Sequence, residues 1–545
     1  MFKWRKILGL LILTSIFSCK KSITSNEEST YSLPERPNIL WIVAEDLGPY
    51  IPSFGDSTVV TPNLSKLTDE GVRYTNLYSP SGVCAPSRAA IATGMYPSSI
   101  GANHMRTNQF MEVTGLPAYE AAPPPEVRMF SELLRAKGYY CTNNSKKDYQ
   151  FKAPVTAWDE SSNKAHWRNR KPEQPFFSIF NFGVTHESGL FEPYEREIVI
   201  SKDIDFPIPP YLPNTETVKR DLWKMYNNIA LLDQQIKKVL DELEEDGLLE
   251  NTIIFFYTDH GGPLPRQKRM VYDSGLNSPM IIRFPNKMNA GQIDDQLISF
   301  VDFAPTILSL AGIDPPEILQ GQSFLDNETR THVFAAADRF DGFTDVKRAI
   351  RDTRFKYIRN YRPEQSYYLP VSYRERIPTM QELLSLRDSG ELNEIQMQWF
   401  REKKPKEELF DCLNDPHEIK NLAENPEYAA KLFELRNAMD QWVEVIDDKP
   451  NLPESELIQQ LWLNQKEQPV TAPPLINTEN DLLNITCETE GASIGYRVSI
   501  DSTSLKSTWN VYTAPFKLKE GTAIEVQAHR IGYKPSEIVQ HKGIK

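Results

Sequence analysis

Three apolar runs along the first half of the chain indicate buried strands. They cover residues 39–44, 174–182 and 252–258, and a segment over 219–245 carries its apolar residues on one helical face. Nearly continuous runs of Ile, Val, Leu and aromatic residues are typical of parallel strands buried on both faces. The pattern therefore predicts an α/β core in which helices alternate with strands.

Polar residues that suit catalysis or metal binding follow these three runs. Glu45 and Asp46 follow the first, His186 follows the second, and Asp259 and His260 follow the third. Because open α/β sheets place their sites at the carboxyl ends of the strands, we expect these side chains to share one site. Taken alone, the acids also fit a solvated turn, and a single histidine also fits a structural role.

The pattern changes toward the C-terminus. Residues 450–474 are rich in Pro and Gln and predict a linker. Beyond them, short alternating segments at 483–487, 493–498 and 523–528 are separated by turns. Such alternation is typical of strands with one buried face, so it predicts a small β-sandwich over 475–545.

The composition limits the classes of function. Of the 545 residues, 40% are hydrophobic, which suits a globular chain with one large unit and one or two smaller ones. The formal net charge of −13 argues against a nucleic-acid partner, because phosphate binding needs a basic surface. If the substrate is an anion, positive charge must be concentrated in the pocket that binds it.

Residues 1–19 have the features of an export signal. Basic residues precede an apolar run over 7–17 that is too short to span a membrane. The run ends in a lipobox-like sequence, which predicts cleavage and acylation of Cys19. Residues 20–36 are polar and predict a tether. We expect an exported, periplasmic or cell-surface protein held by a lipid anchor, with a freely secreted or periplasmic form as the alternative.

The stretch from Cys84 to Arg88 precedes an Ala-rich segment that ends at Thr93-Gly94. A cysteine among small residues also fits a packed core thiol. The frame Cys-x-Pro-Ser-Arg, however, resembles the signature of the type I sulfatases of the alkaline-phosphatase-like superfamily. In that family a formylglycine-generating enzyme oxidises the cysteine before folding. The resemblance implies that Cys84 becomes formylglycine and is the nucleophile, although Met95 departs from the family's usual arginine.

The resemblance covers about residues 37–445. It implies a catalytic domain over 37–360 with a large mixed central sheet, followed by a smaller α+β subdomain over 361–449. With the appended β-sandwich, the expected fold class is α/β, an alkaline-phosphatase- or sulfatase-like sandwich.

The family's metal site matches residues at two strand ends. The resemblance implies that Glu45, Asp46, Asp259 and His260 bind one divalent ion together with the modified Cys84. Three carboxylates and one imidazole form a mainly oxygen donor set, which favours Ca²⁺ over zinc. Glu45 departs from the family's usual aspartate and has a longer side chain.

Sulfate esters resist hydrolysis because their anionic oxygens repel nucleophiles, so an enzyme must place positive charge around the reacting group. The resemblance assigns sulfate binding to Lys146 and Lys268, and Arg88 adds a third cation. Arg269, beside Lys268, has no counterpart in the family pattern.

Two further residues are expected to act on the substrate. His186 matches a substrate-facing histidine of the family and is the expected acid that protonates the leaving alcohol. Asp148 stands where the family carries a second histidine. The division of roles between Asp148 and His186 therefore stays open.

An exported sulfatase with a β-module fits a degrader of sulfated polysaccharide, either an algal polymer such as ulvan or carrageenan, or a glycosaminoglycan. His104 and Arg106 lie in an irregular segment after the nucleophile helix, and Asp338 and Arg339 follow an apolar run. Because loops on a rigid scaffold commonly carry specificity, we expect these four residues to contact the sugar around the sulfate.

Two other functions stay open. A phosphatase or phosphodiesterase of the same superfamily would share the sheet but use Ser or Thr and a two-zinc site rich in histidine, whereas this chain has 8 histidines. A lipid-anchored, non-catalytic carbohydrate-binding protein would need only the β-module. Cys141, Cys412 and Cys487 form no metal knuckle and are compatible with one disulfide or three free thiols.

Overall fold

The computed structural model describes residues 33–326, 329–499 and 508–542. The export signal, Cys19 and most of the predicted tether lie outside these residues. Within them, none of the helices combines the length and the apolar composition that a membrane span needs. The four described cysteines, Cys84, Cys141, Cys412 and Cys487, are all free.

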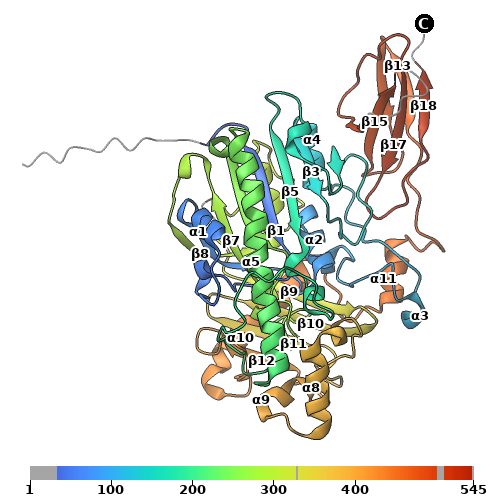
Figure 1. Ribbon diagram of the computed structural model, residues 1–545. Helices are drawn as coiled ribbons and strands as arrows, with labels where there is room; N and C mark the ends of the chain where they lie inside the picture. The colour runs from blue at the N-terminus through green and yellow to red at the C-terminus, as the bar shows by residue number, and fades with distance from the viewer. Residues whose placement is uncertain (1–32, 327–328, 500–507, 543–545) are drawn as a thin grey trace, which may run out of the picture. The chain divides into compact units, whose positions relative to one another are not determined.

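The predicted strands form the middle of a mixed sheet (Figure 1). In the described part of the chain this sheet has eight strands, in the order β4 (Glu160–Ser161), β3 (Tyr140–Asn144), β5 (Phe176–Phe182), β1 (Asn38–Ala44), β6 (Thr252–Thr258), β7 (Asn277–Arg283), β2 (Val72–Tyr78) and β8 (Ile293–Ser299). Strand β1 runs parallel to β5 and β6, and β7 runs antiparallel to β6 and β2. The mixed α/β sheet that the sequence predicts is confirmed.

The register of the central strands sets the position of the site. Ala44, the last residue of β1, pairs with Phe182 of β5 and Thr258 of β6. The three strands therefore end at the same level, and the residues that follow them come together. Every residue of β1 and β6 is buried, as their apolar sequences predict.

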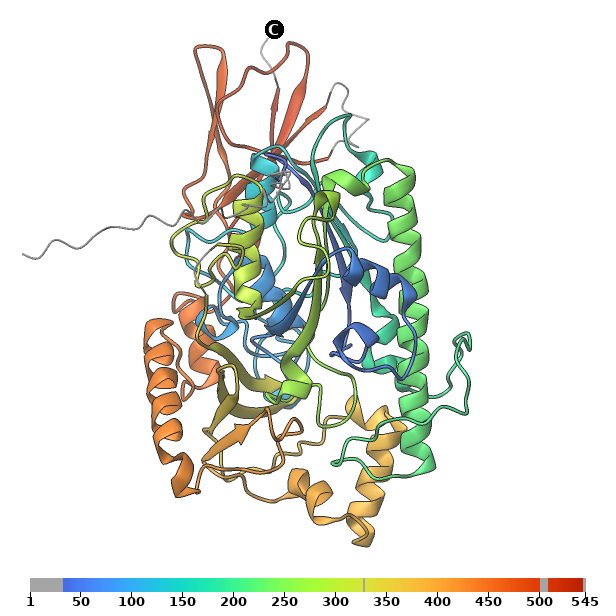
Figure 2. The same cartoon turned by 90° about the vertical axis from the view of Figure 1, so that its left-hand side faces the viewer.

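Helices cover both faces of the sheet, as Figures 1 and 2 show. Helix α5 (Glu216–Glu245) packs on one face with α1 (Pro62–Asp69). Thr215 caps the N-terminus of α5, and its side chain accepts a hydrogen bond from the Val218 N–H. Helices α2 (Cys84–Thr93), α4 (Phe130–Ala136) and α7 (Phe303–Leu310) contribute to the core on the other face, where Trp41 of β1 packs against Phe130 and Phe303.

A second sheet follows in the chain. It is antiparallel and contains β12 (Glu407–Asp411), β11 (Phe355–Asn360), β10 (Phe343–Arg351) and β9 (Val333–Phe340), in that order. Helix α10 (Ala429–Val445) packs on it through Leu435, Met439 and Trp442. Further α-helices are α3 (Met111–Thr114), α6 (Asp273–Leu276), α8 (Pro378–Ser389) and α9 (Glu394–Met397).

The structure differs from the sequence-based expectation in the predicted linker. Helix α11 (Glu454–Leu461) lies inside it, and Ile458 and Trp462 pack against Tyr119. These two residues are four positions apart and therefore lie on the same helical face. The segment after α10 is thus attached to the main unit.

The C-terminal residues form two small sheets. One pairs β13 (Leu475–Glu479) with β14 (Leu482–Thr486), and the other has the order β16 (Asn510–Val511), β15 (Ser493–Ser499), β17 (Ala523–His529), β18 (Val539–Lys542). Leu483 and Ile485 of β14 share one core with Ile524 and Val526 of β17. Each pair is spaced by two residues, as expected of strands that turn one face inward.

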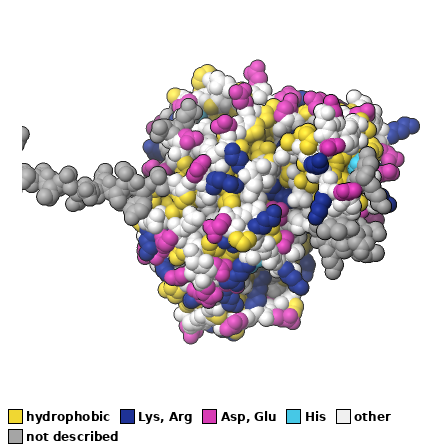
Figure 3. Space-filling model, turned by 90° about the horizontal axis from the view of Figure 1, so that it is seen from above, with side chains coloured by type: hydrophobic (Ala, Val, Ile, Leu, Met, Phe, Trp, Pro, Cys, Tyr) yellow, Lys and Arg dark blue, Asp and Glu magenta, His cyan; other side chains and the backbone are white. Residues whose placement is uncertain are grey.

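Charge on the surface is mixed. On the face that Figure 3 shows, acidic and basic side chains are interspersed, and neither sign covers the face. The excess of 74 acids over 61 Lys and Arg is therefore not gathered into one field there.

Candidate active site

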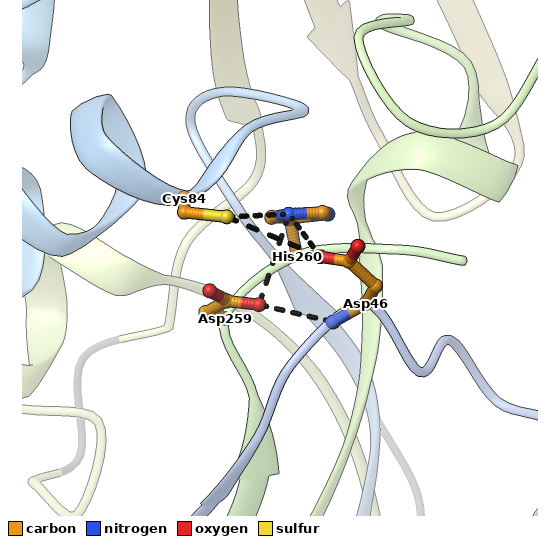
Figure 4. A group of neighbouring side chains, drawn as sticks. All are labelled: Asp46, Cys84, Asp259 and His260. Carbon is orange, nitrogen blue, oxygen red and sulfur yellow. Dashed lines mark hydrogen bonds and ion pairs between the residues drawn. The ribbon is translucent and has the colours of Figure 1, made fainter. Parts of the chain in front are cut away.

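Four buried side chains converge at the carboxyl end of the central strands (Figure 4). Asp46 follows β1, Asp259 and His260 follow β6, and Cys84 is the first residue of α2. One ligand atom from each lies within 4.8 Å of those from the other three, and all four residues are 0% exposed. The structure thus brings together Cys84 and three of the four residues expected to bind metal.

Local backbone contacts hold this cluster in place. The N–H of Asp259 donates to the carbonyl of Ala44, and the N–H of Asp46 donates to the Asp259 carboxylate at 3.2 Å. Asp46 adopts a φ of 51°, a left-handed conformation that aspartate tolerates better than most residues. The turn after β1 thereby directs the Asp46 carboxylate toward His260, with 3.0 Å between Oδ1 and Nε2.

The cluster fits a divalent cation. Two carboxylates and the Nε2 atom of His260 face one another, and burial of such charges is costly unless they are neutralised. Burial would lower the pKa of His260, but Asp259 and Asp46 raise it to about 10. A cation held by the same atoms would balance the two acids without a proton on the imidazole, and this donor set suits a hard divalent ion.

Glu45 lies beside this cluster and belongs to a neighbouring group. Its Oε2 atom is 2.8 Å from Lys146 Nζ, and its carboxylate lies within 4.8 Å of Cys84 and of a His186 ring nitrogen. The structure therefore places Glu45 next to Cys84 but pairs it with Lys146.

Cations surround Cys84. Lys268 Nζ lies 2.6 Å from Asp46 Oδ2, and Arg88 Nε donates to Asp259 Oδ2 at 3.1 Å. Burial would raise the pKa of the Cys84 thiol, but Lys268 and Lys146 lower it to about 7. The positive charge that the sequence analysis requires is thus concentrated at this position.

His186 is directed into the same site. Its Nε2 atom lies 3.2 Å from Lys268 Nζ, and its Nδ1 atom is 2.9 Å from the Ser188 hydroxyl. Burial and Lys268 disfavour its protonated form, whereas Asp46 and Cys84 favour it, and the net effect raises the pKa of His186. The ring is fixed from both nitrogens with one edge toward Cys84.

Asp148 forms an ion pair with Arg106. The guanidinium donates to Asp148 Oδ1 at 2.9 Å, and Lys146 Nζ lies 4.0 Å from Asp148 Oδ2. The Arg106 side chain is 31% exposed, so it lies at the solvent side of the site. Of the four residues expected to contact the sugar, Arg106 is therefore the one with a partly exposed side chain near the site.

The structure corrects the expectation for His104, Asp338 and Arg339, which are 6%, 4% and 3% exposed. Asp338 accepts hydrogen bonds from Arg348, Arg339 pairs with Glu454 at 2.7 Å, and His104 Nδ1 accepts the Arg339 N–H. Asp338 and Arg339 lie inside strand β9 and do not follow it. Buried charges in a sheet need partners, and these residues find them within the protein.

Two residues were missing from the expected site. Glu187 accepts two hydrogen bonds from Arg269, each 2.9 Å long, and lies 3.1 Å from Lys268 Nζ. Arg269 also donates to Asp341 at 3.0 Å. One sequence feature could have predicted them: Glu187 directly follows His186 and Arg269 directly follows Lys268, so both belong to loops that carry expected site residues.

Comparisons with known proteins agree with this geometry. The family model "Sulfatase" matches residues 37–167 and 159–313, and "N-sulphoglucosamine sulphohydrolase, C-terminal" matches 266–399. An ulvan-active sulfatase of Formosa agariphila is 60% identical over 575 aligned positions, covering 98% of this chain and 96% of the relative. The chain belongs to the sulfatase family. Membership makes this sulfatase a sulfuric ester hydrolase, and the family implies a metal ion and formylglycine.

Solved structures confirm the fold of the sulfatase. BT4656, solved with its substrate D-glucosamine-2-N,6-O-disulfate, is 19% identical with a TM-score of 0.53, covering 77% of this chain and 100% of that one. A phosphonate monoester hydrolase of Agrobacterium radiobacter is 17% identical with a TM-score of 0.53, covering 75% of this chain and 96% of that one. The fold is thus shared between sulfatases and phosphonate hydrolases, and family membership decides between them.

Proposed function

We propose that this sulfatase removes sulfate esters from a sulfated polysaccharide, with ulvan as the first candidate. The observation that carries the proposal is the 60% identity to an ulvan-active sulfatase along 98% of the chain. The site agrees, because Lys146, Lys268 and Arg88 place three cations around Cys84, as an anionic ester requires.

Cys84 is the proposed nucleophile position, matured by a formylglycine-generating enzyme. Its aldehyde, hydrated to a diol, would supply one hydroxyl for attack on sulfur and a second for release of sulfate. Lys146 and Lys268 hold the sulfate oxygens, and Arg88 holds Asp259 in position through the bond described above. The Arg88 guanidinium is itself fixed by Asn181, which accepts from it at 2.6 Å.

His186 is the proposed acid for the leaving alcohol. A ring nitrogen lies within 4.8 Å of Cys84 Sγ, so the ring reaches the ester oxygen of a substrate bound there. Asp148 is engaged by Arg106 and therefore acts on substrate recognition in this proposal. In this proposal His186 protonates the leaving alcohol and Asp148 positions Arg106, a division of roles that the sequence leaves open.

The metal is proposed to be one Ca²⁺ ion, held by Asp46, Asp259, His260 and the modified residue 84, with Glu45 at its border. It would stabilise negative charge on the sulfate and neutralise the two acids. The mainly oxygen donor set supports calcium over zinc. Equilibrium dialysis of the metal-free protein against Ca²⁺ and Zn²⁺, with Asp259→Asn as the comparison, tests this choice.

Export and lipid anchoring at Cys19 are proposed from the first 19 residues. Their basic start, apolar run and terminal cysteine support a periplasmic or cell-surface location. Labelling with a palmitate analogue in the producing cell tests it, with Cys19→Ser as the comparison.

Two measurements test the proposed reaction. Mass spectrometry of the peptide that contains residue 84 is expected to show an aldehyde in active protein. The same protein is expected to release sulfate from ulvan oligosaccharides and from an aryl sulfate, and to lose both activities as Cys84→Ala. Full activity with an unmodified thiol, or preference for an aryl phosphate, would contradict the proposal.

A further inference from the structure

A large cavity lies apart from the residues that surround Cys84. Its volume is about 620 Å³, and residues from five segments of the chain line it. We call it the junction groove, and its lining includes Asn103, His104, Val113, Thr114 and Leu116, Asp338 and Arg339, Arg362, twelve residues between Asp447 and Leu463, and Arg530 and Tyr533. Exposed lining residues, Val113 and Lys449 among them, show that it opens to solvent.

The carboxylates in the junction groove are paired with cations of the protein. Arg348 donates to both Asp338 and Asp448 at 2.8 Å, and Arg339 pairs with Glu454. Asp447 and Lys449 form a pair of their own at 2.9 Å. Asp338 and Asp448 share the one Arg348 guanidinium, so the four acids and their three cations leave one formal negative charge.

Two guanidinium groups of the lining have only neutral acceptors among the described residues. Arg362 donates to the Tyr361 carbonyl at 3.1 Å and to Asn451 Oδ1 at 3.4 Å. Arg530 donates to the Glu490 and Pro123 carbonyls at 3.0 and 3.3 Å, and its Nε is buried without a partner. Because the paired acids leave one formal negative charge, Arg362 and Arg530 give the junction groove a formal excess of one positive charge, in a chain whose net charge is −13.

Arg530 also lies against an aromatic face. Its guanidinium carbon is 4.8 Å from the centroid of the Tyr533 ring, which fixes the plane of the side chain. A fixed guanidinium plane suits bidentate binding of sulfate or carboxylate groups. Tyr533 is itself 8% exposed, so the ring that Arg530 packs on is held in place by its surroundings.

We propose that the junction groove binds anionic sugar units of the same polysaccharide, at a distance from the ester that is cleaved. This inference rests on the proposed function. The groove shares the segment after α2 with the active-site rim, because Asn103 and Val113 line it and Arg106 lies between them. In this proposal a polymer extends from the pocket beside Arg106 to Arg362 and Arg530, and the C-terminal module contributes Arg530 and Tyr533 to the substrate site.

The test compares polymer with a small substrate. The double variant Arg362→Ala/Arg530→Ala is expected to raise KM for ulvan polymer about tenfold or more, because two charge-assisted contacts are lost. Activity on an aryl sulfate, which does not reach the groove, is the reference. Arg170→Ala is the matched control. Among the described residues Arg170 also donates only to carbonyls, and it lies 5.5 Å from an aromatic centroid, but it does not line the groove.

Further readouts separate binding from a structural effect. Arg530 links two backbone carbonyls, so its removal can also loosen the module. Arg362→Ala alone and Arg530→Lys, each with an unchanged Tm, distinguish lost polymer binding from such loosening. Weaker polymer binding with a shallower salt dependence supports the proposal. Unchanged polymer KM, or equal losses on polymer and aryl sulfate, overturns it.

The proposal and the proposed function can fail separately. Affinity electrophoresis of the full chain as Cys84→Ala measures binding to sulfated polymer without turnover. Retarded migration that the double variant abolishes supports the groove even if the cleaved ester is not in ulvan. Equal migration of both proteins in polymer gels overturns the groove, whatever the enzyme hydrolyses.

Discussion

At position 148 the chain carries an aspartate where the family resemblance predicts a histidine. The Asp148 carboxylate pairs with Arg106 at 2.9 Å, and Arg106 holds a φ of 62° that an arginine rarely adopts. The ion pair thus helps to fix a partly exposed guanidinium beside Lys146. In the proposed function, an acid at this position directs Arg106 toward the substrate, whereas the family resemblance implies a histidine that faces the nucleophile.

Arg106→Ala is expected to raise KM for a sulfated oligosaccharide about tenfold while changing kcat/KM for an aryl sulfate less than twofold, because a charged contact to the sugar is worth roughly 1.5–3 kcal/mol. Asp148→Asn is expected to produce a smaller effect of the same kind. Kinetics on both substrates check this. A double variant no worse than Arg106→Ala would show that the two residues act together. A loss of kcat on the aryl sulfate in Asp148→Asn alone would instead place Asp148 in the chemistry.

Residue-level prediction from the sequence succeeded where chemistry follows a strand directly. Asp46, Asp259 and His260 fall at strand ends, and the register of parallel strands brings such positions together. It did not succeed for Arg339, whose partner Glu454 is 115 residues away in the chain. A charged residue after an apolar run fits a rim and a buried ion pair equally well, and only tertiary structure distinguishes the two.

Among the elements, α11 shows what composition conceals. Pro and Gln around it predict a linker, but eight helical residues suffice to bury Ile458 against Tyr119 and to bring Glu454 to Arg339. Strand β1 was predictable because burial on both faces leaves a continuous apolar sequence. A short helix docked by one face leaves too few apolar positions for a comparable signal.

Glu454→Ala is expected to lower the free energy of unfolding by about 3 kcal/mol, because it leaves the buried Arg339 guanidinium without a carboxylate. The Tyr119 hydroxyl would lose its acceptor as well, which lies 2.8 Å away. Glu456→Ala, an exposed position on the same helix, is the control. Urea unfolding at pH 7 measures both variants. Similar stabilities for the two would mean that α11 is not anchored through Glu454.

The Glu454 network also reaches the substrate rim. Arg339 donates to the Met105 carbonyl at 3.0 Å, and the Met105 N–H donates back to the Arg339 carbonyl at 2.8 Å. Arg106 is the next residue. Through Glu454 and Arg339, helix α11 therefore holds the backbone that positions the Arg106 guanidinium. We expect Glu454→Ala to raise the KM for a sulfated oligosaccharide as well as to lower stability.

At the scale of the whole molecule, the C-terminal module has a core of its own, formed by residues of β14 and β17. It meets the main unit through specific contacts, among them Arg135 to the Trp509 carbonyl and Arg530 to the Pro123 carbonyl. Both the catalytic site and the junction groove therefore depend on folding, but only the groove depends on the module. Conditions that weaken the module should separate polymer binding from catalysis.

Acid is such a condition, because His529 of β17 is buried and uncharged. Burial lowers its pKa to about 4, an effect that the Tyr533 carbonyl 3.0 Å from Nε2 offsets only in part. The pKa of His529 in the folded protein lies below the unfolded value of about 6.5. Neutral His529 therefore costs the module no stability above pH 6.5, and the free energy of unfolding falls as the pH drops from 6.5 toward 4. The loss amounts to about 3 kcal/mol.

His529→Gln keeps an N–H donor and removes the titration. It is expected to flatten the fall of module stability between pH 6.5 and 4, as followed by calorimetry across that range, while His541→Gln, a half-buried position on β18, leaves the slope unchanged. Arg530 directly follows His529, and the Tyr533 carbonyl accepts the hydrogen bond of His529. Protonation of His529 should therefore disturb both groove residues, so the KM for polymer should rise with acid before activity on the aryl sulfate falls. The same pH slope in His529→Gln and in the unaltered protein would show that another group controls the acid response, and would disconnect the module's stability from this histidine.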